Sequence, residues 1–434
     1  MSANSVKSRG RIRVRIFYQC DPLGLTRGGI DSFIKGQIKA APPDIEISTV
    51  GLTSDRISRP VGKWSSSEAR DGRPVEFFPV GFLAQPGARG LMPLSARLAL
   101  GVTRYMKACT SECDILEFHR FEFMLPLLRD PRPKNAFVHQ NMQEVCRNSA
   151  ADTRWKLVPR LYFCLEDVVL PCCNSVYCVR ADAADLYRAR YPHLADRFRF
   201  IPTWMDPDIF FPVDPSVRDS LRARLGNALN FMPSDQVIVS VGRLDEQKDP
   251  MLCIESFAVL HAWNHNTKLV FVGEGTLRSA LVARARTLGL ADCVTFTGLR
   301  PPEEVADLLR AADALILTSA YEGMPLCVIE ALACGLPVVS IGVGEIHRVV
   351  HPGVNGQLIA TRQPAAVARA ALEVLLASHR YRGRPCTDAV RDYVPKTVLE
   401  PIFQNYRRLA SLRVNRTSTH PGALDGEPDN VPRQ

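Results

Sequence analysis

Two glutamates in the C-terminal half stand where a strand, a tight loop and a helix would gather them at one site. The short apolar run 314–318 predicts a buried parallel strand, and a helix is predicted from about 326 to 334, ending before Gly335. Glu322 then lies in the loop at the carboxyl end of the strand, and Glu330 lies one to two turns into the helix. Two glutamates at this spacing are often solvated helix charges, but the strand before them and the Gly-Leu-Pro-Val-Val segment after them favour a binding site.

The start of this helix offers backbone amides to a negatively charged ligand. The first amides of a helix have no partner within it, and the helix dipole adds positive potential there. Three residues carry such amides, Gly323, Met324 and Leu326, whereas Pro325 has none. The segment therefore predicts an anion site.

Arg243 and Lys248 add two positive charges on a second loop. They follow the apolar run 237–241 and lie five residues apart across a turn that leaves a strand end. A guanidinium offers two parallel donors and an ammonium a point charge, so both side chains can converge on one diphosphate. A basic loop usually faces solvent, which is the alternative for this pair.

The stretch 314–344 resembles the E-x7-E signature of the retaining glycosyltransferases of family 4. The resemblance extends from about residue 11 to residue 408 and is strongest over 237–358. It implies an α/β fold of the GT-B kind, with two doubly wound Rossmann-like domains facing each other across a cleft. It also implies a C-terminal helix that crosses back to the first domain.

The predicted domain boundaries follow from this resemblance and from the alternation of strand and helix patterns. A chain of 434 residues is too long for a single hydrophobic core. We expect an N-terminal acceptor-side domain over 1–205 completed by a helix at 388–412, a nucleotide-sugar-binding domain over 206–387, and a disordered tail over 413–434.

The resemblance assigns a role to each residue of the second domain's site. Gly242, Arg243 and Lys248 match the family's Gly-Arg-x4-Lys motif, whose basic residues hold the diphosphate of the donor. Glu330 would accept hydrogen bonds from the ribose hydroxyls, and Glu322 would contact the hydroxyls of the sugar. No covalent bond to Glu322 is expected, since attack by the acceptor on the same face is the usual proposal for the family.

The first domain would supply the opposite wall of the cleft. Gly28 and Gly29 follow the first predicted strand, and in the resemblance this loop approaches the diphosphate and the transferred sugar. His139 matches a position where the family commonly has a histidine near the donor sugar, and we assign it a catalytic role with Glu322. A lone histidine at a strand end is more often structural, but two at successive strand ends favour a site. The candidates for acceptor binding follow the preceding strand: His119, Arg120 and Glu122.

Composition restricts the setting in which such a protein works. Hydrophobic residues make up 46% of the chain, and no apolar run approaches the roughly 18 residues of a spanning helix. The N-terminus lacks the continuous apolar region of a signal peptide. The 13 cysteines form no C-x-x-C pair and sit mostly in apolar segments, which fits a reducing cytoplasm better than a disulfide framework or a metal site.

The positive charge of the chain is concentrated in its first half. Residues 1–200 hold 30 Lys and Arg against 20 Asp and Glu, while the remaining residues hold 24 against 25. A solvated basic surface is one interpretation; an anionic membrane surface or an anionic acceptor is the other. The aromatic segment 75–83 and the helix expected at 94–109 are the predicted membrane contacts. Nucleic acid is not expected, because no aromatic-interleaved basic run is present.

These features together predict retaining transfer of a hexose from a nucleotide diphosphate sugar to a hydroxyl of a glycan or lipid-linked acceptor, in polysaccharide or glycoconjugate assembly. Two alternatives stay open: a nucleotide-sugar 2-epimerase of the same fold, and a catalytically silent subunit that binds sugar nucleotides. Asp206 and Asp208 spell the Asp-x-Asp that binds metal in other glycosyltransferases, but they fall in the predicted hinge. No metal and no other cofactor is expected, since the basic loop and the helix start already supply positive potential.

Overall fold

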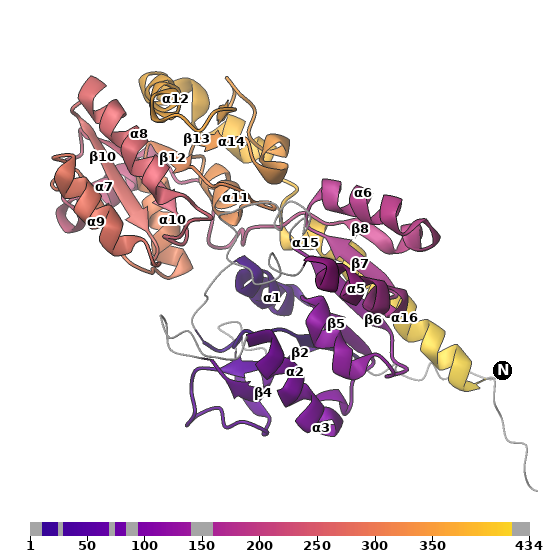
Figure 1. Ribbon diagram of the computed structural model, residues 1–434. Coiled ribbons are helices and arrows are strands. Elements are labelled where there is room, and N and C mark those ends of the chain that lie inside the picture. The colour runs from indigo at the N-terminus through magenta and orange to yellow at the C-terminus, as the bar shows by residue number, and fades with distance from the viewer. Residues whose placement is uncertain (1–10, 25–28, 69–73, 84–93, 140–158, 419–434) are drawn as a thin grey trace, which may run out of the picture.

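A computed structural model describes residues 11–24, 29–68, 74–83, 94–139 and 159–418. These residues form two α/β domains, one built around an eight-stranded sheet and the other around a six-stranded sheet (Figure 1). Figure 1 shows the helices α1 (Gly29–Ala40) and α11 (Leu326–Ala333) at the junction between the two domains. The predicted pair of doubly wound domains is therefore confirmed.

The sheet of the first domain has the order β3-β4-β2-β1-β5-β6-β7-β8. Its strands are β1 (Ile12–Phe17), β2 (Ile45–Thr53), β3 (Ser65–Glu68), β4 (Pro74–Phe82), β5 (Ile115–Phe118), β6 (Lys134–Val138), β7 (Ser175–Cys178) and β8 (Phe198–Phe200). All neighbours are parallel except β3, which runs antiparallel to β4 at one edge. The chain winds outward from β1 in one direction and returns through β5 in the other, so the switch point lies between these two strands.

Helices cover this sheet and join its strands. Besides α1 they are α2 (Leu94–Arg104), α3 (Met106–Thr110), η1 (Phe121–Leu127), α5 (Pro159–Val169), η3 (Leu170–Cys172), α6 (Ala181–Arg190) and η4 (Pro192–Arg197). β4 is an interior strand, and its Phe77 and Phe78 are fully buried. The prediction that these aromatic side chains contact a membrane is therefore wrong, because the sheet uses them as core residues.

The second domain repeats the same winding with parallel strands alone. Its sheet has the order β11-β10-β9-β12-β13-β14, with the switch point between β9 and β12. The strands are β9 (Gln236–Val241), β10 (Thr267–Val272), β11 (Val294–Phe296), β12 (Ala314–Leu317), β13 (Val338–Ile341) and β14 (Gly356–Ile359). Helices α7 (Pro215–Leu229), α8 (Pro250–Trp263), α9 (Arg278–Thr287), α10 (Pro302–Ala311), η5 (Gly344–Arg348), α12 (Pro364–Leu376), α13 (Ser378–Tyr381) and α14 (Arg384–Ala389) accompany α11.

The end of the chain returns to the first domain, as predicted. After α15 (Pro395–Val398), helix α16 (Glu400–Ser418) lies along the first domain (Figure 1) and buries Phe403 and Tyr406 in its core. The guanidinium of Arg407 pairs with Asp44 at 2.7 Å. α16 extends to Ser418, past the start predicted for the tail at residue 413, and residues 419–434 lie outside the described residues. Within the part of the chain that the structure describes, no helix is long and apolar enough to cross a membrane.

Candidate active site

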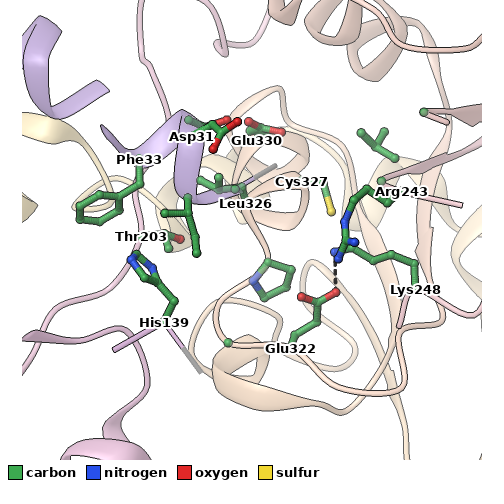
Figure 2. Close-up of a pocket in the computed structure, with 18 of the residues that line it drawn as sticks. Asp31, Phe33, His139, Thr203, Arg243, Lys248, Glu322, Leu326, Cys327 and Glu330 are labelled. Carbon is green, nitrogen blue, oxygen red and sulfur yellow. Dashed lines mark hydrogen bonds and ion pairs between the residues drawn. The ribbon is translucent and has the colours of Figure 1, made fainter. Parts of the chain in front are cut away.

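A cleft of about 560 Å³ lies between the domains, at the carboxyl ends of strands from both sheets. Its walls include residues that follow β1 in the first domain and residues that follow β9 and β12 in the second. Open α/β sheets bind their ligands at such switch points. Figure 2 shows side chains from the two domains facing one another across this space.

Two helix starts meet in the cleft. α1 begins at Gly29 and α11 begins at Leu326, and a Cβ on Gly29 would lie 3.4 Å from Cδ1 of Leu326. Gly323 and Met324 line the same wall just before α11. The positive ends of both helix dipoles are therefore directed at one ligand volume, which suits an anion. Gly28 lies outside the described residues.

Lys248 and Glu322 form an ion pair on the wall of the second domain. Nζ of Lys248 lies 2.5 Å from Oε1 of Glu322 (Figure 2), and the hydroxyl of Ser319 donates to the same oxygen at 2.6 Å. Burial lowers the pKa of Lys248, but the Glu322 carboxylate and its hydrogen bond outweigh this effect, so the pKa is raised overall. The ammonium therefore stays charged where it faces the cleft.

The loop that carries Glu322 is fixed by close contacts from both domains. A Cβ on Gly323 would lie 2.7 Å from the carbonyl oxygen of His139, so only glycine fits there. On the other side, Gly344 has φ of +57° and packs against the carbonyl oxygens of Glu322 and Gly323. The guanidinium of Arg180 donates to the Glu322 carbonyl at 2.6 Å from the first domain. Glu322 is thus positioned by the domain interface as well as by its own strand.

Arg243 is held at the rim of the cleft. Its guanidinium pairs with Asp245 at 2.5 Å and donates to Oε1 of Gln247 at 2.7 Å, and its side chain is 49% exposed. Gly242 precedes it with φ of +154°, and a Cβ there would lie 3.2 Å from Cε of Lys248. The backbone turn at Gly242 therefore lets the basic loop close over Lys248.

Glu330 lines the same wall of the cleft, about one helical turn after the start of α11. The surrounding protein removes its carboxyl from water and raises its pKa to about 7, while the charge of Lys248 opposes this shift. Cys327 lies between the two, and burial raises the pKa of its thiol to about 12. This thiol is therefore protonated near neutral pH and is no nucleophile.

The wall of the first domain carries the carboxylate of Asp31 at the start of α1 and otherwise presents mostly neutral side chains among the described residues. It includes Phe33, Thr203 and His139, whose ring approaches that of Phe33 edge to face with centroids 5.7 Å apart (Figure 2). Burial, with His119 and Arg120 nearby, lowers the pKa of His139 well below its usual value. His139 is therefore neutral at pH 7.

The three residues predicted to bind the acceptor do not line the cleft. His119 is buried behind His139, and its Nδ1 lies 2.9 Å from Nε2 of His139. Arg120 pairs with Glu122 at 3.3 Å, and Glu122 is buried. Sequence reasoning also missed the contacts of Arg180, because these arise only when the two domains meet.

Asp206 and Asp208 are paired with a lysine in the described structure. Nζ of Lys39 lies 2.6 Å from Asp206 and 3.1 Å from Asp208 at the junction of the domains. Among the described residues, no group of three or more His, Cys, Asp or Glu side chains could hold a metal ion.

The fold and the cleft define a two-domain α/β protein of the GT-B class. Sucrose-phosphate synthase from Thermosynechococcus elongatus covers 93% of this chain and 100% of its own, with a TM-score of 0.74 and 20% identity. Anabaena Alr3699/HepE, solved in complex with UDP-glucose, covers 94% of this chain and 100% of its own, with a TM-score of 0.64 and 17% identity. Identities this low show a shared fold.

The family model of the glycosyl transferases group 1 matches residues 224–384, within the second domain. A D-inositol 3-phosphate glycosyltransferase of Segniliparus rotundus is 33% identical over 208 residues, 47% of this chain and 44% of that protein. A mannosylfructose-phosphate synthase of Agrobacterium fabrum is 31% identical over 196 residues, 43% of this chain and 42% of that protein. The chain thus spans less than half the length of these curated relatives. The family prediction is confirmed, and neither relative is named as an epimerase.

Proposed function

We propose that the protein is a retaining glycosyltransferase that moves a hexose from a nucleotide diphosphate sugar to a hydroxyl of a glycan or lipid-linked acceptor. The observation that carries the proposal is the Lys248–Glu322 ion pair just before α11, inside a cleft whose other wall is the first domain. The ion pair places the ammonium of Lys248, which can bind a phosphate, next to the carboxylate of Glu322, which can bind sugar hydroxyls. A domain that only bound nucleotides would need the first of these groups and not the second.

Departure of the nucleoside diphosphate leaves negative charge on the oxygen that held the sugar. Lys248 and the amides at the start of α11 would stabilise that charge in the partly dry interior of the cleft. Arg243 at the rim would hold the outer phosphate, exchanging its Asp245 partner for the ligand. These groups lie on one wall, so the leaving diphosphate stays on the second domain.

The sugar would lie between Glu322 and the wall of the first domain. Glu322 would accept hydrogen bonds from its hydroxyls, and His139 would face it from the other domain. Glu330, further along α11, would accept hydrogen bonds from the ribose. An acceptor hydroxyl that attacks the anomeric carbon on the face from which the diphosphate leaves gives retention of configuration.

A panel of sugar nucleotides tests this proposal. Thermal stabilisation identifies the donor, because a ligand at roughly 100 times its dissociation constant adds about 2.7 kcal/mol. Proton NMR of the product then reports the anomeric configuration. Stabilisation by a sugar nucleotide without release of nucleoside diphosphate over any acceptor tested would support the silent binding subunit. Conversion of the donor to its 2-epimer would support the epimerase.

We also propose that transfer needs no metal ion or other cofactor. The positive groups of the second-domain wall are supplied by the protein itself, and Lys39 occupies the Asp206 and Asp208 carboxylates. Activity that survives excess EDTA supports the proposal. Strict dependence on magnesium or manganese would overturn it.

Finally, we propose that the protein works in the cytoplasm, on an anionic membrane surface that carries its acceptor. Twelve described cysteines are free thiols, which is consistent with a reducing compartment. On the first domain, Leu100 is 59% exposed and Met106 is 37% exposed, next to the exposed Arg104 and Lys107 on α2 and α3. Each basic residue near such a surface contributes about 1 kcal/mol.

Vesicle co-sedimentation tests this attachment. The protein should bind vesicles containing phosphatidylserine at low salt, and high salt should release it. Replacement of Arg104 and Lys107 by glutamine should weaken binding, and the same changes at Arg284 and Arg286 on α9 of the other domain provide the control. Failure to bind anionic vesicles at low salt would show that the basic surface serves another purpose.

A further inference from the structure

A chain of buried hydrogen bonds leads from the cleft into the core of the first domain. It begins at His139, continues through His119 to Glu117 on β5, and ends at Tyr406 on α16 and Gln37 on α1. The side chains of His119 and Glu117 are fully buried. None of these groups behind His139 reaches the cleft, so the proposed chemistry leaves them without a role.

The two histidine rings meet edge to edge. Their centroids are 5.1 Å apart with planes 18° from parallel, and Nδ1 of His119 lies 2.9 Å from Nε2 of His139. A centroid separation of this size equals the N···N distance plus the distance from each centroid to its nitrogen. The contact is therefore a hydrogen bond with both rings in nearly one plane. The face of the His119 ring stacks on Phe137, with ring centroids 4.6 Å apart.

The donors around Glu117 determine where the protons lie. Nε2 of Gln37 donates to the Tyr406 hydroxyl at 2.7 Å and to Oε1 of Glu117 at 2.9 Å. The Tyr406 hydroxyl, having accepted from Gln37, donates its own proton to Oε2 of Glu117. The opposite orientation of Gln37 would set its amide oxygen against the carboxylate. Glu117 therefore acts only as an acceptor.

His119 must then donate to Glu117. Its Nε2 lies 3.2 Å from Oε1 of Glu117, so this nitrogen carries the proton, and in the ring with a single proton Nδ1 is an acceptor. The proton in the contact between the rings consequently belongs to Nε2 of His139. Nδ1 of His139, the ring nitrogen that remains, has no proton.

We infer that Glu117 and His119 are positioning residues that hold His139 in the tautomer protonated on Nε2, so that its Nδ1 accepts a hydrogen bond from a hydroxyl of the bound sugar. The inference rests on the proposed function for the identity of the ligand, but not for the tautomer. The inference also requires the ligand to be the hydrogen-bond donor. A hydroxyl can donate to Nδ1, whereas a group that only accepts, such as an ether oxygen, cannot form this hydrogen bond. His139 thus selects for a free hydroxyl at the position it faces.

The tautomer can be measured without any assay of activity. Nitrogen-15 labelling of the nine histidines, with His139 assigned by its loss in His139→Asn, separates protonated from unprotonated ring nitrogens. We expect Nδ1 of His139 to resonate as an unprotonated nitrogen and Nε2 as a protonated one. In Glu117→Gln, whose amide can donate to His119, this preference should be lost. In Tyr406→Phe, which removes a donor to Glu117 but keeps the carboxylate, it should persist.

Activity supplies the second arm of the test. Glu117→Gln should lower kcat about 10-fold, the effect of one lost hydrogen bond in the transition state. Its affinity for the nucleoside diphosphate should stay within about two-fold, because Lys248 and Arg243 are untouched. A deoxy analogue of the donor that lacks the hydroxyl facing His139 should be turned over equally by Glu117→Gln and the unmodified protein.

The outcomes separate the two proposals. If Nδ1 of His139 carries the proton in the unmodified protein, or if Glu117→Gln leaves the tautomer and kcat unchanged, the positioning role is overturned whether or not the protein transfers a sugar. If no sugar nucleotide is a donor but the tautomer depends on Glu117 as expected, the positioning stands and the transferase proposal fails.

Discussion

The two walls of the cleft hold their central side chains in different ways. The second-domain wall presents charge on short loops: Lys248 and Glu322 meet at 2.5 Å, and Arg243 sits at the rim with Asp245. The first-domain wall presents the neutral His139, supported from behind by hydrogen bonds that converge from several elements. The charged pair is held by short loops and by contacts at the domain interface, whereas the ring of His139 is held by buried side chains behind it in its own domain.

Lys248→Met should produce the largest loss of diphosphate affinity, because it removes the positive charge beside Glu322 on the second-domain wall. The variant loses a charge-assisted contact to the diphosphate and leaves the buried Glu322 without its counter-charge, so affinity for the nucleoside diphosphate should fall on the order of 100-fold. Calorimetry measures the affinity, and the exposed Lys396→Met is the control. Unchanged affinity would show that Lys248 serves only to neutralise Glu322.

Gly323→Ala tests the place where the two walls touch. The new methyl group would approach the His139 carbonyl oxygen to 2.7 Å, so the domains must separate or the loop must shift. We expect a loss of about 1–3 kcal/mol in stability, together with reduced transfer. Gly342→Ala is the matched control, because its nearest neighbour, the carbonyl oxygen of Ile359, lies 3.8 Å away. Equal stability of the two variants would contradict the tight contact.

The Glu330 carboxyl gives the charged wall a pH dependence. Its pKa rises from 4.5 to about 7 on folding, so the folded state binds its proton more tightly and this group's contribution to stability falls as pH rises from about 4.5 to about 7. Glu330→Gln should therefore raise Tm by a few degrees at pH 8, about the effect of 1 kcal/mol, and leave Tm unchanged at pH 4.

The same substitution should weaken binding of the nucleotide at pH 8, since the ribose loses its carboxylate acceptor. Glu322→Gln should spare the nucleotide and slow transfer. Equal losses of nucleotide affinity in both variants, with turnover unaffected, would contradict the division of roles between the two glutamates.

Asp245→Asn should give the smallest change in diphosphate affinity, and it should increase that affinity. It frees the half-exposed Arg243 from a competing carboxylate, and an exposed ion pair is worth about 0.2–1 kcal/mol, so diphosphate affinity should rise by about 1.4- to 5-fold. Glu246→Gln makes the same change of charge on the neighbouring exposed residue. An equal gain in both variants would assign the effect to net charge alone.

The sequence allowed the second wall to be predicted far better than the first. Lys248, Glu322 and Glu330 lie on loops and a helix start at strand ends, and their spacing together with the family resemblance predicted them on one wall. His119 was read as an acceptor residue because it follows a strand, as His139 does. Its burial behind His139 depends on the offset between two strands and on a tyrosine far away in the chain, which no local pattern encodes.

The return of α16 makes completion of the first domain depend on synthesis of the second. Glu117, near the middle of the first sheet, receives its hydroxyl donor from Tyr406, which leaves the ribosome only after the whole second domain. Until then the surface that Phe403 and Tyr406 cover stays exposed to solvent. The first domain is thus translated first and completed last, so slow folding of the second domain prolongs the time for which apolar surface of the first is open to misassembly.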